Sequence, residues 1–407
     1  MDGREVERWL AVERHRRGEP IEAICSSMKK SRSWFYKWWN RAEEVGEEWY
    51  EERSRARHQS GRCEEEVRRQ IVETRGRLDA EGTFVSAQMI AWELEEQNVS
   101  VPSISTIKRV LQSAGLTTPK RRAPKGTKYP APLAMEPGAV HQADFVGPRY
   151  VNRGRFYSLN AVDVCSGRVA IEPIHSRATE DVIPGLWNIW TRLGVPATLQ
   201  LDNELVFFGN RRYPNALGQV MRLCFSMGVE MLFIPIREPW RNSFVEKFND
   251  HWNRKFYRRA KREGFEPLRI ESLLFESRHN AKWRYSKLGG RTPNGALSQS
   301  SAELRFPDRP TPPPMPLATP SRGRVSFIRL IRSDRQLEIF GQRLPMPPEA
   351  TYEYVRATID VAAQQLTVTL RDEVLDTHPF PLEKATASRS RQGAKGRASS
   401  ASLRPSG

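Results

Sequence analysis

Cysteine is scarce in this chain of 407 residues: there are four, spread along its length, and no two form a C-x-x-C pair. That spacing supports neither a zinc site nor a disulfide framework, so we expect reduced thiols, mostly in the core of a cytoplasmic protein. No apolar run approaches the roughly 18 residues of a membrane-spanning helix, and the first residues are too charged for a secretory signal. There is no G-x-x-x-x-G-K-S/T loop, so we do not expect the chain to hydrolyse ATP itself.

Acidic residues are also in deficit. The chain has 48 Asp and Glu against 65 Lys and Arg, a formal net charge of +17. This charge indicates a polyanionic partner, nucleic acid foremost, with an anionic membrane surface as the rival. Only 38% of the residues are hydrophobic, but they include 11 Trp and 17 Phe, so folded cores are expected. The length exceeds what one hydrophobic core normally spans, which predicts two to four domains.

Residues 1–60 have the pattern of three short helices separated by tight turns, which is typical of a helix-turn-helix DNA-binding domain. The residues that mark these helices are Val6, Trp9, Leu10 and Val12 in the first, Pro20 with Ile21, Ala23 and Ile24 in the second, and Trp34, Phe35 and Trp38 after a Ser31 or Ser33 cap in the third. The segment is nearly neutral overall, yet it has no acid between positions 29 and 42. A recognition helix needs such local positive charge to meet phosphates. Arg32 and Lys37 are therefore the candidates for groove contacts. The alternative is the solvated face of a small helical bundle.

Residues 61–116 repeat this pattern and predict a second helix-turn-helix or winged-helix-like domain. Lys108 and Arg109 are its candidates for DNA contacts, on a third helix that also carries Ile104, Ile107, Val110 and Leu111. Residues 117–137 form a basic linker with Lys120, Arg121 and Arg122. Such an arm usually tracks a DNA backbone or minor groove, although a basic linker can also remain solvated.

Residues 138–300 read as an α/β domain. Strand-like runs cover about 139–146, 156–164, 168–175, 197–201 and 230–234, and helical runs lie near 179–193, 217–227 and 243–262. Three strands, a helix, a strand, a helix, a strand and a helix is the order of a ribonuclease H-like core. Residues 307–320 are proline-rich and predict a stiff, extended linker. Residues 321–383 alternate at period two in several short runs, which predicts a small β-barrel, and residues 384–407 form a basic, disordered tail.

Three short stretches of the α/β domain each place one carboxylate at a defined position. They are Gly138-Ala-Val-His-Gln-Ala-Asp144, Ala197-Thr-Leu-Gln-Leu-Asp202-Asn203 and Asn242-Ser-Phe-Val-Glu246. Converging carboxylates suit hard Mg²⁺ ions, which take oxygen ligands and leave room for phosphates. Two such ions can support phosphodiester chemistry. Asp144, Asp202 and Glu246 are therefore the candidate metal ligands and catalytic residues.

Each of these carboxylates also has an ordinary structural interpretation. Asp144 could be a plain strand-end aspartate, and Asp202 with Asn203 could be turn residues. Glu246, three residues after Ser243, fits a capping box that would serve only a backbone N–H. Asp163, at the end of the second strand, reads as a turn or supporting residue and not as a ligand. The three carboxylates in order on strand, strand and helix favour the metal site.

Basic residues are concentrated in the segment that begins five positions after Glu246. Residues 251–262 contain six Lys or Arg and no Asp or Glu. Arg254, Arg258 and Lys261 recur at helical spacing and predict a basic ridge that leads away from the carboxylates. A solvated helix face would normally interleave acids, so DNA contact is the better interpretation.

With these motifs the chain resembles the retroviral-integrase-like DDE transposases of bacterial insertion sequences, with a layout similar to phage Mu-type transposases. The resemblance covers the α/β core through Asp144, Asp202 and Glu246 and extends to the flanking modules. The chain departs from the family at Glu204 and Ser243, where glycine is usual, and residues 209–215 lengthen the second gap. Neither departure removes a ligand.

The resemblance implies a DNA transposase that binds element ends and target DNA, and cuts and joins strands at the metal-binding triad Asp144, Asp202 and Glu246. It implies two Mg²⁺ ions per site, with Mn²⁺ as a substitute, a homo-oligomer on double-stranded DNA, and a location at the bacterial nucleoid. It leaves open a separate ATPase helper. The main competitor is a non-catalytic, sequence-specific DNA-binding regulator derived from such an enzyme. A ribonuclease H-like nuclease shares the core chemistry but does not explain two sequence-reading modules ahead of it.

Overall fold

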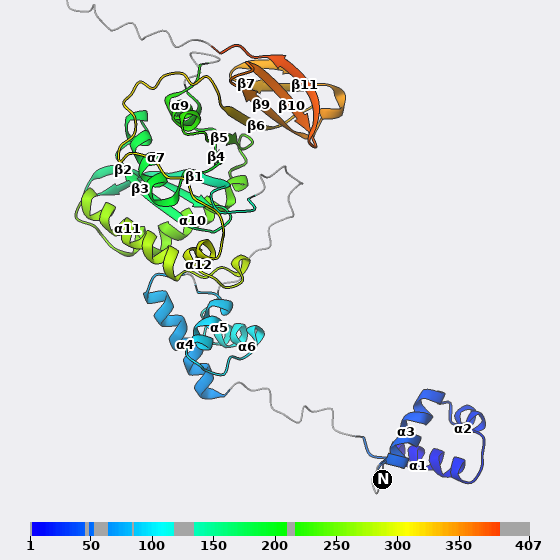
Figure 1. Cartoon of the computed structure of the whole chain (residues 1–407). Helices are drawn as coiled ribbons and strands as arrows, with labels where there is room; N and C mark the ends of the chain where they lie inside the picture. Colours follow the sequence, from blue (N-terminus) through cyan, green and yellow to red (C-terminus); the bar gives the residue numbers. More distant parts are fainter. Residues whose placement is uncertain are drawn as a thin grey trace, which may run out of the picture. The chain divides into compact units, whose positions relative to one another are not determined.

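The computed structural model describes residues 2–44, 49–52, 64–83, 85–117, 134–209 and 216–382. The chain forms two compact units, Met1–Glu64 and Glu65–Gly407 (Figure 1). The predicted linker contacts at Lys120, Arg121 and Arg122, and the basic tail, lie outside the described residues. Every helix in the described part is too short or too polar to cross a membrane.

The N-terminal unit contains three helices, α1 (Gly3–Arg16), α2 (Ile21–Met28) and α3 (Arg32–Glu44). Between α2 and α3, Lys29 adopts a left-handed conformation with φ of 52°. The hydroxyl of Ser31 then accepts a hydrogen bond from the backbone N–H of Trp34 at 3.1 Å, which caps α3. Pro20 precedes α2 as its N-cap and is not its first residue. The predicted helix, turn and helix are confirmed.

The apolar face predicted for the first helix is wrong at three of its four positions. Val6, Trp9 and Leu10 are 46%, 40% and 44% exposed, and only Val12 is buried. Arg8 takes the inner position instead, because its guanidinium lies 4.2 Å from the centre of the Trp38 ring and donates to the carbonyl of Tyr50 at 2.8 Å. A long basic side chain with a partner for its charge can occupy a core-facing position, and residue type alone does not reveal that.

The second unit begins with a three-helix module, α4 (Glu65–Ala80), α5 (Ala87–Glu96) and α6 (Ile104–Ser113). Its small core contains Ile71, Leu78, Ile90, Leu94 and Ile107. Ser86 and Ser103 cap α5 and α6 through their hydroxyls. The three predicted helices are therefore present.

The α/β core follows with strands β1 (Val140–Val151), β2 (Gly154–Asp163), β3 (Val169–Ile174), β4 (Thr198–Leu201) and β5 (Glu230–Phe233). Its helices are α7 (Thr179–Leu193), α8 (Leu205–Phe208), α9 (Gln219–Ser226), α10 (Ser243–Lys255), α11 (Phe265–Lys282) and α12 (Pro293–Ser298). The strand order is β3-β2-β1-β4-β5. β1, β2 and β3 are antiparallel neighbours, whereas β4 and β5 run parallel to β1. The predicted element order is thus present as a mixed sheet with helices.

Helices cover both faces of this sheet. One apolar cluster joins β-strand residues such as Ala143 and Leu159 to Trp187 and Trp190 of α7 and to α9. A second cluster joins Val146 and other strand residues to α10 and α11. Residues of even number in the first half of β1 therefore face α10, since side chains alternate along a strand.

The C-terminal strands extend the core sheet and do not form a separate closed barrel. They are β6 (Arg324–Leu330), β7 (Gln336–Ile339), β8 (Gln342–Pro345), β9 (Tyr354–Asp360), β10 (Gln365–Leu370) and β11 (Glu373–Pro379). β6 pairs in parallel with β5, so β9, β10 and β11 complete a nine-stranded sheet, and β7 pairs with β8 alone. Alternating residues identify a strand but not its neighbour, which is why the predicted barrel is wrong in this respect.

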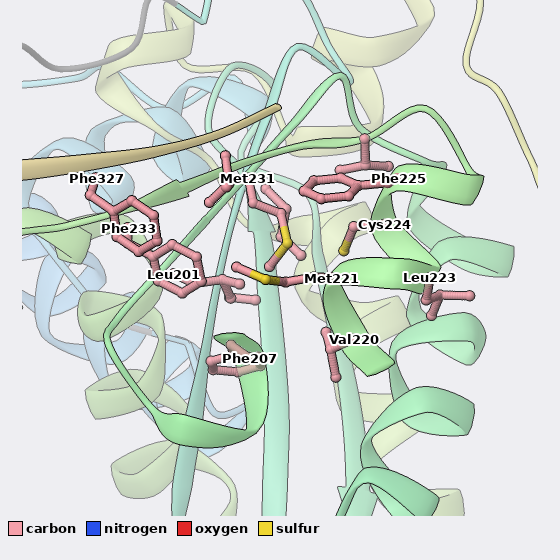
Figure 2. Packing of buried hydrophobic residues seen from close by; sticks show 14 of the residues in the cluster. Leu201, Phe207, Val220, Met221, Leu223, Cys224, Phe225, Met231, Phe233 and Phe327 are labelled. Carbon is pink, nitrogen blue, oxygen red and sulfur yellow. The ribbon is translucent and has the colours of Figure 1, made fainter. Parts of the chain in front are cut away.

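The core and the C-terminal strands share one apolar cluster (Figure 2). Phe233 of β5 stacks on Phe327 of β6, with ring centres 5.0 Å apart. The proline-rich segment before β6 also lies against the core. Trp187 donates to the carbonyl of Arg309 at 3.2 Å, and the backbone N–H of Leu317 donates to Gln219 at 2.7 Å. The segment has neither helix nor strand and bends at residues 308–311 and 315–316. Hydrogen bonds fasten it to α7 and α9, whereas the sequence predicts a stiff linker.

Candidate active site

The sheet register places Asp144 and Asp202 side by side. Gln142 of β1 pairs with Gln200 of the parallel strand β4. Asp144 and Asp202 each lie two residues further along their chains, so both project at the same level and toward the face that α10 covers. The two candidate aspartates therefore meet because of strand pairing, although 58 positions separate them in the sequence.

Buried amides hold the start of α10 over these strands. The side-chain oxygen of Gln142 accepts hydrogen bonds from the backbone N–H groups of Phe244 and Val245, at 2.9 and 3.3 Å. Gln200 donates to the carbonyl of Arg241 at 3.0 Å. Asn242 donates to the carbonyl of Ala143, also at 3.0 Å. These bonds fix the first turn of α10, the turn that carries Glu246.

A chain of hydrogen bonds orients the Asp144 carboxylate. One of its oxygens accepts from its neighbour's backbone N–H, that of Phe145, and the other accepts from the Asn249 side chain, both at 2.8 Å. Asn249 accepts in turn from Asn160 at 2.8 Å, and Asn160 accepts from the Ser158 hydroxyl at 2.7 Å. Asn249 lies three residues after Glu246, so both side chains project from one face of α10.

Electrostatic repulsion within the site acts mainly on Asp144. Burial, followed by repulsion from Asp202 and Glu246, raises the pKa of Asp144 to about 7. Burial raises the pKa of Asp202 to about 6 and also raises the pKa of Glu246. Among the described residues, the Glu246 carboxylate has no hydrogen-bond or ion-pair partner. A cation near Asp144 would be favoured, because it would offset the repulsion that this carboxylate receives from Asp202 and Glu246.

Asp144 and Glu246 line one open cavity of about 450 Å³, together with Arg149, Asn249 and Asn253. We call it the carboxylate cavity. Within the described part of the chain, no three His, Cys, Asp or Glu side chains are grouped closely enough to hold a metal ion. The oxygen ligands suit Mg²⁺ in type, but they would have to draw together for all three to contact it.

The structural alternatives for these residues are partly resolved. The capping-box interpretation of Glu246 is wrong, because Asn242 is the N-cap of α10 and makes no side-chain cap bond, while Gln142 serves the first N–H groups instead. Asp202 does take part in a turn, since one oxygen accepts from the Glu204 backbone at 3.2 Å. Asp163 is a turn residue as predicted and accepts hydrogen bonds from Ser166 and from the Gly138 backbone.

The C-terminal strands contact the loops beside the carboxylates. Arg329 of β6 donates to the side-chain oxygen of Asn203 at 2.8 Å, and Asn203 donates to the carbonyl of Ile234 at 2.6 Å. Tyr354 of β9 donates to Glu238 at 2.7 Å, just before the 3-10 turn Pro239–Asn242 that leads into α10. The sheet extension therefore supports the loop that carries Asp202 and the segment that leads into α10, the helix that carries Glu246.

The predicted basic ridge on one long helix is wrong. α10 ends at Lys255, so Arg258 lies in a 3-10 turn (Tyr257–Arg259) and Lys261 in the loop before α11. The guanidinium of Arg262 donates to the carbonyls of Phe256, Tyr257 and Ala260, and these bonds stabilise the interruption. Arg254 pairs with Asp250 at 2.9 Å.

Several candidate DNA contacts in the helical modules are exposed. Arg32 and Lys37 lie on α3, Arg32 in an ion pair with Glu22 and Lys37 4.7 Å from the Trp38 ring centre. Lys108 and Arg109 are exposed on α6. Arg109 donates to the Thr106 hydroxyl at 3.2 Å.

Sequence reasoning missed the roles of Gln142 and Gln200. Both stand two positions before a candidate aspartate, on the same face of their strands, and both are buried. A buried glutamine needs hydrogen-bond partners, so its position beside a candidate ligand was an available signal. The partners themselves lie about 40 and 100 positions away and leave no local pattern.

Comparison with known proteins gives one family match. Residues 2–47 match the family of the homeodomain-like domain HTH_23, in agreement with the helix-turn-helix of the N-terminal unit. No curated protein matches the chain.

Similar solved structures include the cryo-EM structure of the simian T-cell lymphotropic virus intasome in complex with PP2A regulatory subunit B56 gamma. It has 14% identity and a TM-score of 0.37, and covers 75% of this chain and 96% of that chain. Another is the HTLV-2 integrase catalytic core domain in complex with magnesium, in its dimeric form. It has 15% identity and a TM-score of 0.32, and covers 40% of this chain and 99% of that chain.

The raised pKa values predict how the stability of the metal-free protein depends on pH. The folded Asp144 carboxyl, with a pKa of about 7, retains a proton that the unfolded chain releases near pH 4. Its contribution to the free energy of unfolding is therefore complete below pH 4 and is lost as the pH rises through 7. Asp144→Asn should raise the unfolding free energy at pH 8 by about 2–4 kcal/mol and flatten its pH dependence. Thermal unfolding in EDTA between pH 5 and 8 measures this, with Glu180→Gln as an exposed control that should behave like the wild type.

Proposed function

We propose that this chain is a DNA transposase that binds element ends through its helix-turn-helix modules and cuts and joins DNA strands at Asp144, Asp202 and Glu246. The observation that carries the proposal is the parallel pairing of β1 and β4. This pairing puts Asp144 and Asp202 at one level, beneath the helix turn that carries Glu246. The resemblance to DDE transposases of bacterial insertion sequences supports the same assignment.

In this proposal the three carboxylates bind two Mg²⁺ ions, for which Mn²⁺ substitutes. When bound, such ions activate an attacking oxygen and stabilise a leaving one in phosphodiester chemistry. Asn249 holds the Asp144 carboxylate in one orientation, and Gln142 and Gln200 hold the turn that presents Glu246. Because Asp144 has a pKa of about 7, ion binding competes with a proton and should weaken below neutral pH.

A non-catalytic DNA-binding regulator is the competing function. One observation favours it: the described carboxylates are not grouped closely enough to hold a metal ion. A supercoiled-plasmid cleavage assay with Mg²⁺ or Mn²⁺ separates the two proposals. The plasmid should carry the DNA that flanks the gene, where a transposase implies inverted repeats bracketed by short direct duplications. Metal-dependent cleavage at the repeats supports the transposase, and end binding without cleavage in either metal supports the regulator.

Joining two DNA ends requires two active sites held together, so we propose a homo-oligomer that assembles on double-stranded DNA. A separate ATPase helper and a location at the bacterial nucleoid remain proposals that follow from the family resemblance. Light scattering of the protein with and without end DNA tests the assembly. A monomer on a single end at every protein concentration would contradict it.

We expect Arg32 and Lys37 to contact DNA when the N-terminal unit binds it. A contact to a base edge would relax specificity when it is lost. A phosphate contact would weaken binding to all sequences alike and lower the salt slope by about one. We expect Lys37→Ala and Arg32→Ala in the full chain each to show one of these two signatures in titrations at several salt concentrations. Arg332→Ala is the matched control, since Arg332 is exposed on the C-terminal half. Wild-type affinity, specificity and salt slope in both variants would refute this assignment.

A further inference from the structure

A second cavity, of about 530 Å³, lies between the β1–β2 hairpin and the segment after α10. It is lined by residues 150–152 of the hairpin, residues 257–262 and Leu268. We call it the hairpin cleft. Its lining contains no Asp or Glu and four cationic side chains. An acid-free cavity with this charge favours a polyanionic ligand.

Two of the four cations in the hairpin cleft are already paired. Arg259 pairs with Asp79 at 3.4 Å and Arg262 with Glu271 at 2.6 Å. Arg258 and Lys261 are exposed, and within the described residues neither has an ion-pair or hydrogen-bond partner for its side chain. These two charges are available for phosphates.

The hairpin cleft also has an aromatic ring at its edge. Tyr150 is 60% exposed, and its ring has no aromatic partner among the described residues. Its backbone is nevertheless fixed, because the hydroxyl of Tyr257 accepts from the Tyr150 N–H at 3.3 Å and donates to the Tyr150 carbonyl at 3.1 Å. Tyr257 is itself stacked on the buried Trp252, with ring centres 5.5 Å apart. A single exposed aromatic is ordinary on a protein surface, but a fixed one beside free cations has the composition of a stacking platform for a base.

Arg149 connects the hairpin cleft to the carboxylate cavity. It lines the carboxylate cavity with Asp144 and Glu246, and its guanidinium carbon lies 5.6 Å from the centre of the Tyr257 ring. A nucleic-acid strand with one phosphate in the carboxylate cavity would therefore pass Arg149 and reach Tyr150 within a few nucleotides. Strand-binding grooves combine this kind of basic track with aromatic stacking.

We propose that the hairpin cleft binds an unpaired stretch of the DNA strand that runs into the carboxylate cavity. Tyr150 stacks on one base, and Arg149, Arg258 and Lys261 contact phosphates. The inference rests on the proposed transposase function and adds that the DNA is locally unpaired beside the cut. A fully paired duplex keeps its bases stacked on each other and offers no free base face to Tyr150.

The test is a binding measurement on the full-length protein in EDTA, so that no cleavage occurs. The ligands are two fluorescent duplexes of one end sequence, one fully paired and one with mismatches that leave its last three base pairs open. We expect the wild type to prefer the open duplex. Tyr150→Ala should lose about tenfold in affinity for it, the size of one base stack, and change less than twofold on the paired duplex. Tyr150→Trp should restore the preference. Tyr352→Ala, at another exposed tyrosine, is the control and should match the wild type.

A second readout reports the stack itself. A 2-aminopurine base in the open stretch should be quenched on binding to the wild type and to Tyr150→Trp, but not to Tyr150→Ala. Arg258→Ala and Lys261→Ala should each reduce the salt slope by about one. Equal binding of both duplexes by the wild type, or unchanged affinity and quenching in Tyr150→Ala, would overturn the proposal. This test is independent of the proposed transposase activity, because binding is measured in EDTA, where no cleavage occurs. A protein that does not cleave DNA in Mg²⁺ refutes the proposed function, whereas only the preference for the open duplex decides the role of the hairpin cleft.

Discussion

Asp144→Asn, Asp202→Asn and Glu246→Gln should each lower metal-dependent DNA cleavage by about a thousandfold or more. Each change keeps the shape of the side chain but removes a charge that the ions need, and losing that stabilisation costs several kcal/mol in the transition state. Affinity for end DNA should change less than about twofold, because the helix-turn-helix modules do not use these residues. A plasmid cleavage assay checks the loss of activity, and a binding assay on the same protein preparations checks that the affinity for end DNA is retained.

Glu180→Gln provides the matched control for Glu246→Gln. Glu180 also lies in the first turn of a helix, α7, but it is exposed and away from the carboxylate cavity. The Glu180→Gln protein should cleave DNA at the wild-type rate. Near-wild-type cleavage in any of the three triad variants would show that the residue is not a ligand.

Truncation after Leu304 should prevent the core from folding. The removed strand β6 pairs with β5, and its side chains share an apolar cluster with Phe225, Met231 and Phe233 (Figure 2). Exposing three such side chains costs about 2 kcal/mol each, which approaches the 5–15 kcal/mol that holds a typical domain together. We expect no cooperative thermal unfolding of the truncated core, whereas a separable C-terminal barrel would leave a folded core with intact end binding.

A milder substitution separates folding from positioning. Arg329→Met retains most of the side-chain volume but loses the hydrogen bonds to Asn203 and Ile234. The protein should remain folded, while cleavage falls about tenfold, the size expected for one hydrogen bond to a charged group. Arg329→Lys should recover part of the activity, and Arg332→Met should have no effect. Unchanged cleavage by a folded Arg329→Met protein would show that β6 does not position the Asp202–Asn203 loop.

The sequence predicted those features that depend on local patterns. Apolar runs located β1 and β4, and Asp202 directly follows β4 as expected. Asp144 is not at a strand end as expected, because β1 continues to Val151. It could not show that β6 pairs with β5, because any alternating strand can add to any open edge. It also could not show that Arg8 replaces Trp9 and Leu10 in the core of the N-terminal unit, since that exchange depends on Trp38 and Tyr50, about 30 to 40 positions away.

The end of α10 illustrates the same limit. Residues 251–262 contain neither glycine nor proline, so a helix through Arg262 was the natural expectation. The chain instead turns at Phe256, and the Arg262 guanidinium donates hydrogen bonds to backbone carbonyls of the segment beyond the end of α10. This turn moves Arg258 and Lys261 from a helix face into the hairpin cleft.

The most direct test of the central claim is strand joining. A duplex of one element end with a free 3′-hydroxyl is incubated with the protein, a supercoiled target plasmid and Mg²⁺. The account predicts covalent joining of one and two ends to the plasmid, dependent on Mg²⁺ or Mn²⁺ and absent in Asp144→Asn. Two results would contradict the account: end DNA that binds but is never joined to the plasmid in either metal, or a nicked plasmid that carries no covalently attached end DNA.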